Sequence, residues 1–207
     1  LYTGGKTMIA IIDYGAGNLQ SVKNAFKHIG TEAVITGEKS EIAAADAVVL
    51  PGVGAFGDCM ASLEKAGLTE TVKAAANSGK PFLGICLGLQ LLFEESEESP
   101  GVKGLGIFKG KIVKIPDTGL KIPHMGWNSI ETVKKSKILD GSPYVYFVHS
   151  YYLETDDKEL VSAYTEYGAR LAVAVERDNV FAVQFHPEKS GDAGMEILKK
   201  FAALGGK

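Results

Sequence analysis

Cys86 is the residue of this chain whose type and surroundings best suit covalent chemistry. It follows the apolar run 81–85 and is the central residue of Gly84-Ile85-Cys86-Leu87-Gly88, the glycine-x-nucleophile-x-glycine pattern of a tight strand-to-helix turn. Glycines on either side remove the side chains that would collide in such a turn. A thiol held there lies near the positive end of the following helix, which favours the reactive thiolate. A structural cysteine in a β–α turn is the alternative that this stretch alone leaves open.

His186 and Glu188 can supply a base and an orienting carboxylate for this thiol. His186 ends the apolar run 180–185, and Pro187 biases it toward extended backbone. Side chains two residues apart in extended backbone share a face, so Glu188 can hold one imidazole nitrogen while the other faces a thiol. Taken alone, a surface His–Glu pair is the alternative interpretation. Together with Cys86, the segment predicts the nucleophile, base and orienting group of a triad.

Two glycine-rich segments follow apolar runs and need separate interpretations. In 51–57, Gly52 and Gly54 flank Val53, and such backbone can turn N–H groups toward a ligand. A plain flexible loop is the alternative for this segment. The segment 15–17, Gly-Ala-Gly, suggests a dinucleotide-binding turn, but it lacks the third glycine and a phosphate-binding context, so we do not expect one.

The first half of the chain alternates between strand-like and helix-like segments. The runs 8–12, 33–36, 47–50 and 82–85 are short and apolar, as expected of parallel strands buried on both faces. Helices are expected at 19–29, at 69–77 and from Cys86 to about residue 93. Serial β–α units predict an α/β fold with a doubly wound, largely parallel central sheet flanked by helices. Ligands bind beyond the carboxyl ends of such strands, where both 51–57 and Cys86 fall.

The second half is predicted to add a mixed or antiparallel sheet. Short strand-like runs separated by turns occur at 107–115, 129–133, 144–148, 160–164, 171–176 and 180–185, and an amphipathic helix closes the chain from residue 190. The acidic run 94–98 is expected to be a solvated helix end and loop. Without a repeat or linker, we expect a single domain over 8–207. Because a natural chain would begin with methionine, residues 1–7 are expected to be an extension foreign to that domain.

Composition excludes several classes of partner. The chain has 22 basic and 25 acidic residues, a net charge of −3, and no basic patch of the kind that nucleic-acid binding needs. No apolar run approaches the roughly 18 residues of a membrane span. The two cysteines, Cys59 and Cys86, form no C-x-x-C pattern, so we expect a cytoplasmic protein without disulfide or metal site, in which Cys59 is an inert buried thiol.

Six segments taken together are similar to one known family. The segments 12–19, 51–57, 85–90, 123–128, 147–151 and 184–189 resemble class I (triad) glutamine amidotransferases, and within them the glutaminase subunits of imidazole glycerol phosphate synthase. The likeness extends from Met8 to the closing helix. It implies a flavodoxin-like fold without a cofactor that hydrolyses L-glutamine to glutamate and ammonia through a Cys86 thioester. It also implies a heterodimer with a (β/α)8-barrel cyclase that consumes the ammonia in histidine biosynthesis.

The resemblance also implies a role for individual residues. Cys86 is the nucleophile, His186 the base and then the acid, and Glu188 the orienting carboxylate. The implied oxyanion donors are the backbone N–H of Leu87 and one from Val53 or Gly54; the implied glutamine contacts are Gly52, Gln90, Ser150 and Tyr151; and the implied partner contacts are Ala16, Asn18, Trp127, Tyr146 and Lys189. Met125, beside Trp127, is expected to lie in the core.

Two other functions remain open from the sequence. A glutaminase of similar fold could serve another synthase, such as that for pyridoxal phosphate. A catalytically silent binding subunit could regulate its partner, although the intact Cys86, His186 and Glu188 argue against this function.

Overall fold

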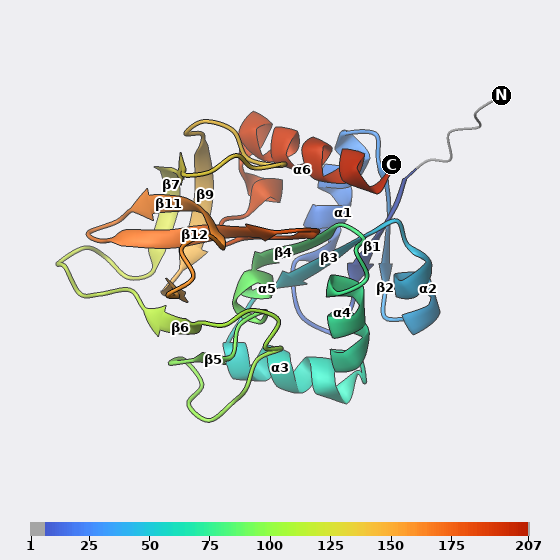
Figure 1. Cartoon of the computed structure of the whole chain (residues 1–207), viewed down its shortest axis with the longest axis horizontal. Helices are drawn as coiled ribbons and strands as arrows, with labels where there is room; N and C mark the ends of the chain where they lie inside the picture. The colour runs from blue at the N-terminus through green and yellow to red at the C-terminus, as the bar shows by residue number, and fades with distance from the viewer. Residues whose placement is uncertain (1–6, 207) are drawn as a thin grey trace.

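A computed structural model describes residues 7–206 and shows a central sheet with helices on both faces (Figure 1). Apart from Thr7, the expected extension 1–7 lies outside these residues. The helices are α1 (Leu19–His28), α2 (Lys39–Ala44), α3 (Phe56–Lys65), α4 (Thr69–Ala76), α5 (Leu87–Gln90) and α6 (Gly191–Gly205), with a 3₁₀ turn η1 (Pro187–Lys189) before α6. Helices α1 and α6 cover one face of the sheet, and α3, α4 and α5 cover the other.

Within residues 7–206, eleven strands form the main sheet. Its principal order is β2-β1-β3-β4-β13-β12-β10-β6-β5, with β11 beside β12 and β8 beside β11. These strands are β1 (Met8–Ile12), β2 (Glu32–Thr36), β3 (Ala47–Gly52), β4 (Phe82–Cys86), β5 (Glu95–Ser96), β6 (Lys111–Lys114), β8 (Glu131–Thr132), β10 (Tyr151–Glu154), β11 (Val161–Glu166), β12 (Arg170–Arg177) and β13 (Val180–Val183). A separate antiparallel pair joins β7 (His124–Ser129) to β9 (Tyr144–His149). The predicted α/β fold with a largely parallel sheet and an added antiparallel sheet is confirmed.

The parallel strands form because their side chains are buried on both faces. Along β1, Ala10 and Ile12 pack into the core under α3 and α4, whereas Ile9 and Ile11 pack into the core under α1 and α6. Successive side chains of a strand point to opposite faces, so a strand between two helical layers needs a continuous apolar run. This explains why the run 8–12 identified β1 with its observed bounds.

One strand was assigned to the wrong part of the sheet. We expected 180–185 to belong to the added mixed or antiparallel sheet, but β13 lies in the central sheet and pairs with β4 in parallel. On its other side β13 pairs with β12 in antiparallel orientation. The buried pattern of β13 suits either environment, so periodicity could not decide between them. The strand that leads to His186 is therefore a direct neighbour of the strand that ends at Cys86.

The helix after Cys86 is shorter than expected, and the acidic run behind it is not simply solvated. Helix α5 ends at Gln90, because the carbonyls of Leu91, Leu92 and Phe93 accept hydrogen bonds from the loop 105–108 instead of continuing the helix. The carboxylates of 94–98 accept backbone N–H groups of other segments, for example Glu97 from Lys114 and Glu98 from Phe56. The expectation of a solvated helix end was wrong, because these long-range partners are invisible in the local sequence.

Several shorter elements were also missed. Helix α2 buries only Ile42, so it has no apolar stripe, and α3 begins inside the glycine-rich segment. Strands β7 and β10 were not expected, and the run 107–115 contributes only β6. Each of these elements depends on a partner distant in the sequence rather than on its own periodicity.

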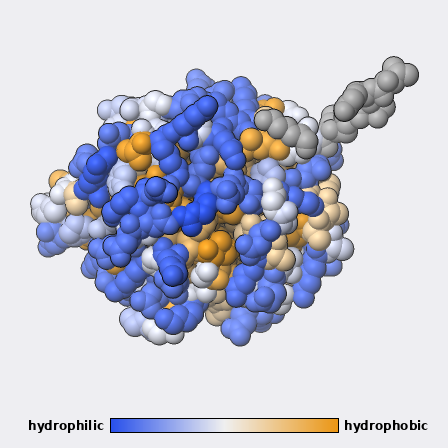
Figure 2. Space-filling model, in the orientation of Figure 1, coloured by the Kyte–Doolittle hydropathy of each residue, from blue (hydrophilic) through white to orange (hydrophobic). Residues whose placement is uncertain are grey.

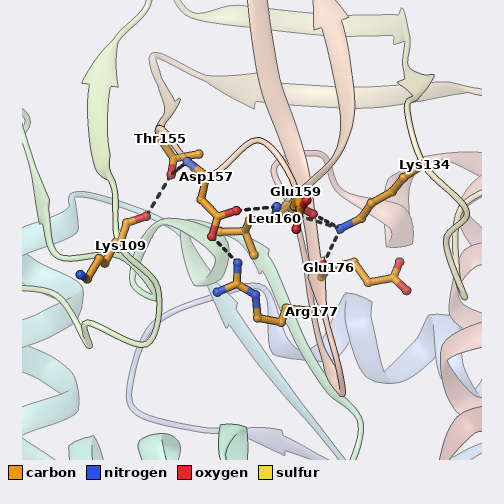
Figure 3. A network of polar contacts seen from close by, with 8 residues as sticks. All are labelled: Lys109, Lys134, Thr155, Asp157, Glu159, Leu160, Glu176 and Arg177. Carbon is orange, nitrogen blue, oxygen red and sulfur yellow. Dashed lines mark hydrogen bonds and ion pairs between the residues drawn. The ribbon is translucent and has the colours of Figure 1, made fainter.

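A polar network fastens the loop 155–160 to the end of β12 (Figure 3). Arg177 and Asp157 form an ion pair, and the Lys134 ammonium donates to the carbonyls of Glu159, Leu160 and Glu176. The Arg177–Asp157 pair is partly exposed, so water screens the attraction between its charges. The Lys134 contacts satisfy three carbonyls at once and hold the β10–β11 connection against the sheet.

The molecular surface in the view of Figure 2 is mainly hydrophilic, and its apolar areas are small and interrupted by polar side chains. None of the helices in residues 7–206 combines the length and apolar character needed to cross a bilayer.

Candidate active site

Cys86 occupies the strained turn that its flanking glycines predict. It is the last residue of β4 and has φ 56° and ψ −111°, a left-handed backbone that residues other than glycine rarely adopt. A Cβ atom at Gly88 would lie 1.9 Å from the carbonyl oxygen of Leu50, and one at Gly84 would lie 2.7 Å from that of Gly88. The close approach of these backbones is therefore possible only with glycine at both positions.

The register of three parallel strands brings the candidate residues to one edge of the sheet. Gly52 pairs with Cys86 across β3 and β4, and Val183 pairs with Ile85 across β13 and β4. The chain after β13 continues to His186, whose backbone N–H donates to the carbonyl of Tyr146 at 2.9 Å. Parallel strands place their carboxyl ends together, so residues from three distant segments meet here.

His186 and Glu188 form a buried pair. The Nδ1 atom of His186 lies 2.8 Å from Oε1 of Glu188, and the side chains are 5 % and 2 % exposed. His186 and Cys86 line the same cavity, and interaction with the Cys86 side chain is one cause of the raised pKa of the imidazole; because Glu188 occupies Nδ1, Nε2 is the nitrogen available to the sulfur. The three side chains thus lie in the order that a nucleophile, its base and an orienting carboxylate would need.

The charge state of His186 differs from that of its buried neighbours. Burial lowers the pKa of His186, but its hydrogen bonds and charge interactions with Cys86 and Glu188 outweigh burial and raise that pKa to about 10. Burial lowers the pKa of His124 to about 4 and that of His149 to about 3. At neutral pH His186 is therefore protonated, while His124 and His149 are neutral. The protonation of His186 stabilises the fold fully below its ordinary pKa of about 6.5, and this stabilisation is lost as the pH rises through about 10.

A cavity of about 330 Å³ opens at this edge of the sheet. Its lining residues are Val53, Gly54, Cys86, Leu87, Gln90, Glu98, Pro123, Val148, His149, Ser150, Tyr151, His186 and Lys189. The structure thus brings together Cys86, His186, the three expected oxyanion residues and three of the four expected glutamine contacts. Glu188 lies behind His186. Gly52 does not line the cavity but is buried between Leu87 and the Tyr14 hydroxyl.

The segment expected to supply an oxyanion donor is anchored on both sides of Gly52. The Tyr14 hydroxyl donates to the carbonyl of Pro51 at 2.8 Å, and the Cys59 thiol donates to the carbonyl of Val53 at 3.4 Å. Cys59 is buried, as expected, but it also has a defined polar contact. These two donors fix the carbonyls of Pro51 and Val53. The backbone of Val53 and Gly54 is thereby held at the cavity wall.

The expected partner contacts fall into two groups. Trp127 and Tyr146 form one group with Lys189. The two aromatic residues face each other across β7 and β9, with ring centroids 6.0 Å apart. The Trp127 indole lies near Gly191, and Lys189, two residues before Gly191, is exposed. Ala16 and Asn18 lie in the loop between β1 and α1, where Asn18 occupies the N-cap position without a side-chain cap hydrogen bond.

Met125 was placed wrongly by the sequence interpretation. It is 62 % exposed, and Trp127 on the same side of β7 is 56 % exposed. Alternation along the strand instead turns His124 inward, where its ring stacks on Phe147 and Tyr167. An isolated methionine carries no signal that distinguishes these two faces.

Four residues of the cavity wall were not among the expected site residues: Glu98, Pro123, Val148 and His149. The carboxylate of Glu98 accepts the Phe56 N–H at 2.8 Å, so it caps α3 and faces the cavity from a distant loop. Nothing in the run of glutamates 94–98 distinguishes Glu98, although His149 lies in a segment that carried the family resemblance.

The tight elbow predicts that Gly88→Ala is strongly destabilising. The added methyl group would overlap the Leu50 carbonyl, so we expect a loss of more than about 4 kcal/mol in unfolding free energy, measured by urea denaturation. Gly101→Ala is the control, because Gly101 has φ +85° but open space, and we expect a loss of only about 1–2 kcal/mol. Equal losses in the two variants would contradict the steric explanation.

The raised pKa of His186 predicts a titration that depends on Cys86. Removing the sulfur in Cys86→Ala removes a cause of the raised pKa, so the His186 pKa should fall from about 10 toward its ordinary value, as followed by NMR of the imidazole. Cys59→Ser is the matched control, because it changes the other thiol and keeps a donor for Val53. A His186 pKa unaffected by Cys86→Ala would show that the contact with Cys86 is not its cause.

The chain is similar to known proteins of one family. The family model described as "Glutamine amidotransferase class-I" matches residues 10–204. The protein named imidazole glycerol phosphate synthase subunit HisH from Methanothermobacter thermautotrophicus is 54 % identical over 199 residues, which cover 95 % of this chain and 98 % of that protein. The protein of the same name from Caldanaerobacter subterraneus is 52 % identical over 200 residues, covering 95 % and 98 % of the two chains.

Solved structures share the fold at low sequence identity. The structure titled PurLQS from Thermotoga maritima matches with a TM-score of 0.76 at 19 % identity, covering 95 % of this chain and 98 % of that chain. A structure titled glutamine amidotransferase matches with a TM-score of 0.75 at 21 % identity, covering 96 % and 99 %. By the match of residues 10–204 and by relatives about half identical over nearly the whole chain, this protein belongs to the class I glutamine amidotransferase family.

Proposed function

We propose that this chain is the glutaminase subunit of an imidazole glycerol phosphate synthase and hydrolyses L-glutamine to glutamate and ammonia. The observation that carries the proposal is the meeting of Cys86 with the buried His186–Glu188 pair at one cavity. The HisH relatives support this particular synthase. A glutaminase for pyridoxal phosphate synthase is not favoured by these relatives, and the complete triad argues against a silent regulatory subunit.

The residues suggest the following reaction. The Cys86 thiolate attacks the side-chain carboxamide of glutamine, and the oxyanion accepts hydrogen bonds from the N–H of Leu87 and from that of Val53 or Gly54. Each such donor contributes about 3–4 kcal/mol to transition-state stabilisation in comparable enzymes. Protonated His186 gives its proton to the departing ammonia and then, as a base, activates the water that hydrolyses the glutamyl thioester. Glu188 holds the imidazole in the orientation that both steps require.

The cavity offers polar groups for the amino-acid part of the substrate. Within residues 7–206, the buried Oε1 atom of Gln90 has no hydrogen-bond partner, so a substrate N–H can satisfy it. Ser150 and Tyr151 line the same wall, and the Glu98 carboxylate can attract the α-ammonium group. Gly52 does not line the cavity, so we propose that it acts indirectly, by holding the adjacent Val53 at the cavity wall.

We further propose that the ammonia passes to a (β/α)8-barrel cyclase in a heterodimer. Ammonia released into water would be protonated and lose its nucleophilicity, so a docked partner is chemically useful. The proposed docking surface consists of Ala16, Asn18, Trp127, Tyr146 and Lys189, and exposed Met125 extends it beside Trp127. Large exposed aromatic side chains of this kind are common interface anchors. We place the protein in the cytoplasm as a single domain over 8–207 without a cofactor.

The assignment of the nucleophile predicts that Cys86→Ala lowers glutamine turnover at least about a thousandfold, measured as glutamate release in the presence of the cyclase. A glutamine-directed alkylating reagent should modify Cys86 and spare Cys59, which serves as the internal control because it is buried against Val53. Labelling at Cys59, or turnover that survives Cys86→Ala, would refute the assignment.

The docking surface predicts that Trp127→Ala weakens cyclase binding about tenfold or more, measured by calorimetry, because a large anchor residue is lost. Val133→Ala is the matched control, since Val133 is also apolar and 40 % exposed but lies beyond β8. Equal effects of the two substitutions would remove Trp127 from the interface.

A further inference from the structure

Gln184 is a buried polar residue of the site to which the reaction above gives no role. It follows β13 directly, two residues before His186, and is fully buried. Its Nε2 atom lies 3.7 Å from Sγ of Cys86, and its Oε1 atom lies 3.0 Å from Nε2 of Gln90. Gln184 does not line the cavity, so its side chain contacts the nucleophile from the protein side.

The direction of the Gln184 amide follows from a neighbouring carbonyl. The Tyr151 carbonyl can only accept, and it lies 3.3 Å from Nε2 of Gln90. The amide nitrogen of Gln90 therefore uses one N–H for Tyr151 and the other for Gln184. The oxygen of the Gln184 amide must then be the acceptor, which leaves its N–H groups as the donors that face Cys86.

The same carbonyl also contacts His149, and His149 in turn contacts His124; both histidines are neutral. Nδ1 of His149 lies 2.9 Å from the Tyr151 oxygen, so it carries the proton, and Nε2 of His149 is an acceptor. Nδ1 of His124 lies 3.0 Å from that Nε2 and must donate to it. At the end of this series of hydrogen bonds, Nδ2 of Asn128 lies 3.4 Å from Nε2 of His124 and donates to it. Every bond in the series has one possible direction, so the Gln184 amide cannot turn over without breaking a buried hydrogen bond.

We propose that Gln184 is a catalytic residue that stabilises the thiolate form of Cys86 by donating an amide N–H to Sγ. In the reactive state the proton lies on Nε2 of His186, so the sulfur is a thiolate beside an imidazolium. The neutral thiol donates to the Val148 carbonyl at 3.9 Å, but the thiolate has no proton to donate and can only accept. A fixed N–H donor therefore favours the thiolate over the thiol.

The inference rests on the proposed role of Cys86 as nucleophile, and it is tested by the pH dependence of Cys86 alkylation. The full chain is treated with iodoacetamide, and the modification of Cys86 is followed by mass spectrometry of its peptide. Gln184→Met removes the amide at similar length, and Gln184→Asn keeps a polar amide but draws it back from the sulfur. The titratable groups around Cys86 are Tyr14, Glu98, His149, Tyr151, His186, Glu188 and Lys189, and neither substitution changes any of them.

We expect the midpoint of the alkylation profile to rise by about one pH unit in both variants. This shift corresponds to a change of about tenfold in the equilibrium between the thiol and the thiolate of Cys86. Turnover of glutamine should fall by about the same factor while KM changes little, because Gln184 does not touch the cavity. Gln20→Met, on the exposed surface of α1, is the matched control and should leave the profile unchanged.

The outcomes separate this inference from the proposed function. If Gln184→Met does not fold, the midpoint measured for Gln184→Asn decides. If Cys86 of the wild type reacts with a clear midpoint and the Gln184 variants have the same midpoint, the role of Gln184 is overturned. This holds even if urea denaturation shows that the variants are less stable. A wild-type Cys86 that does not react at any pH would instead count against Cys86 as the nucleophile.

Discussion

The site depends on one steric constraint, the left-handed backbone of Cys86 between two glycines. With φ at 56°, the chain reverses at the end of β4 and leaves the sulfur at the carboxyl edge of the sheet. This is possible because Gly88 lies where any side chain would overlap the Leu50 carbonyl of the adjacent strand. The strain at Cys86 is therefore maintained by the packing of β3, β4 and α5, and it is used to expose a thiol at a fixed point.

Three buried histidines near Cys86 differ in their charge state. His124, His149 and His186 are all buried, and burial alone makes each imidazole neutral. Only His186, among these three, has an acidic partner on one nitrogen and the thiol on the other. The result is one charged imidazole beside two neutral ones that serve as directed hydrogen-bond donors and acceptors.

Much of the fold and the centre of the site could be predicted from local patterns. Continuous apolar runs identified the first strands, since burial on both faces requires them, and Gly84 and Gly88 identified the elbow. The same reasoning failed for β13, since a buried run can pair in either direction, and for α5, whose end depends on the loop 105–108. It also missed Glu98, because nothing in the local sequence distinguishes this cavity-lining residue from the neighbouring glutamates of 94–98. It placed Met125 in the core, although β7 turns this side chain to solvent.

The sequence by itself determined the chemistry that is available: a thiol in a strained turn, an imidazole two residues from a carboxylate, and glycines beside a potential oxyanion donor. These are local properties, because turn sterics and side-chain alternation act over a few residues. Only the tertiary structure decided that the three segments meet, since this depends on β13 lying beside β4. It also decided the hydrogen-bond directions from His124 through Gln184 to Cys86, because each direction is imposed by a carbonyl or ring nitrogen far away in the chain.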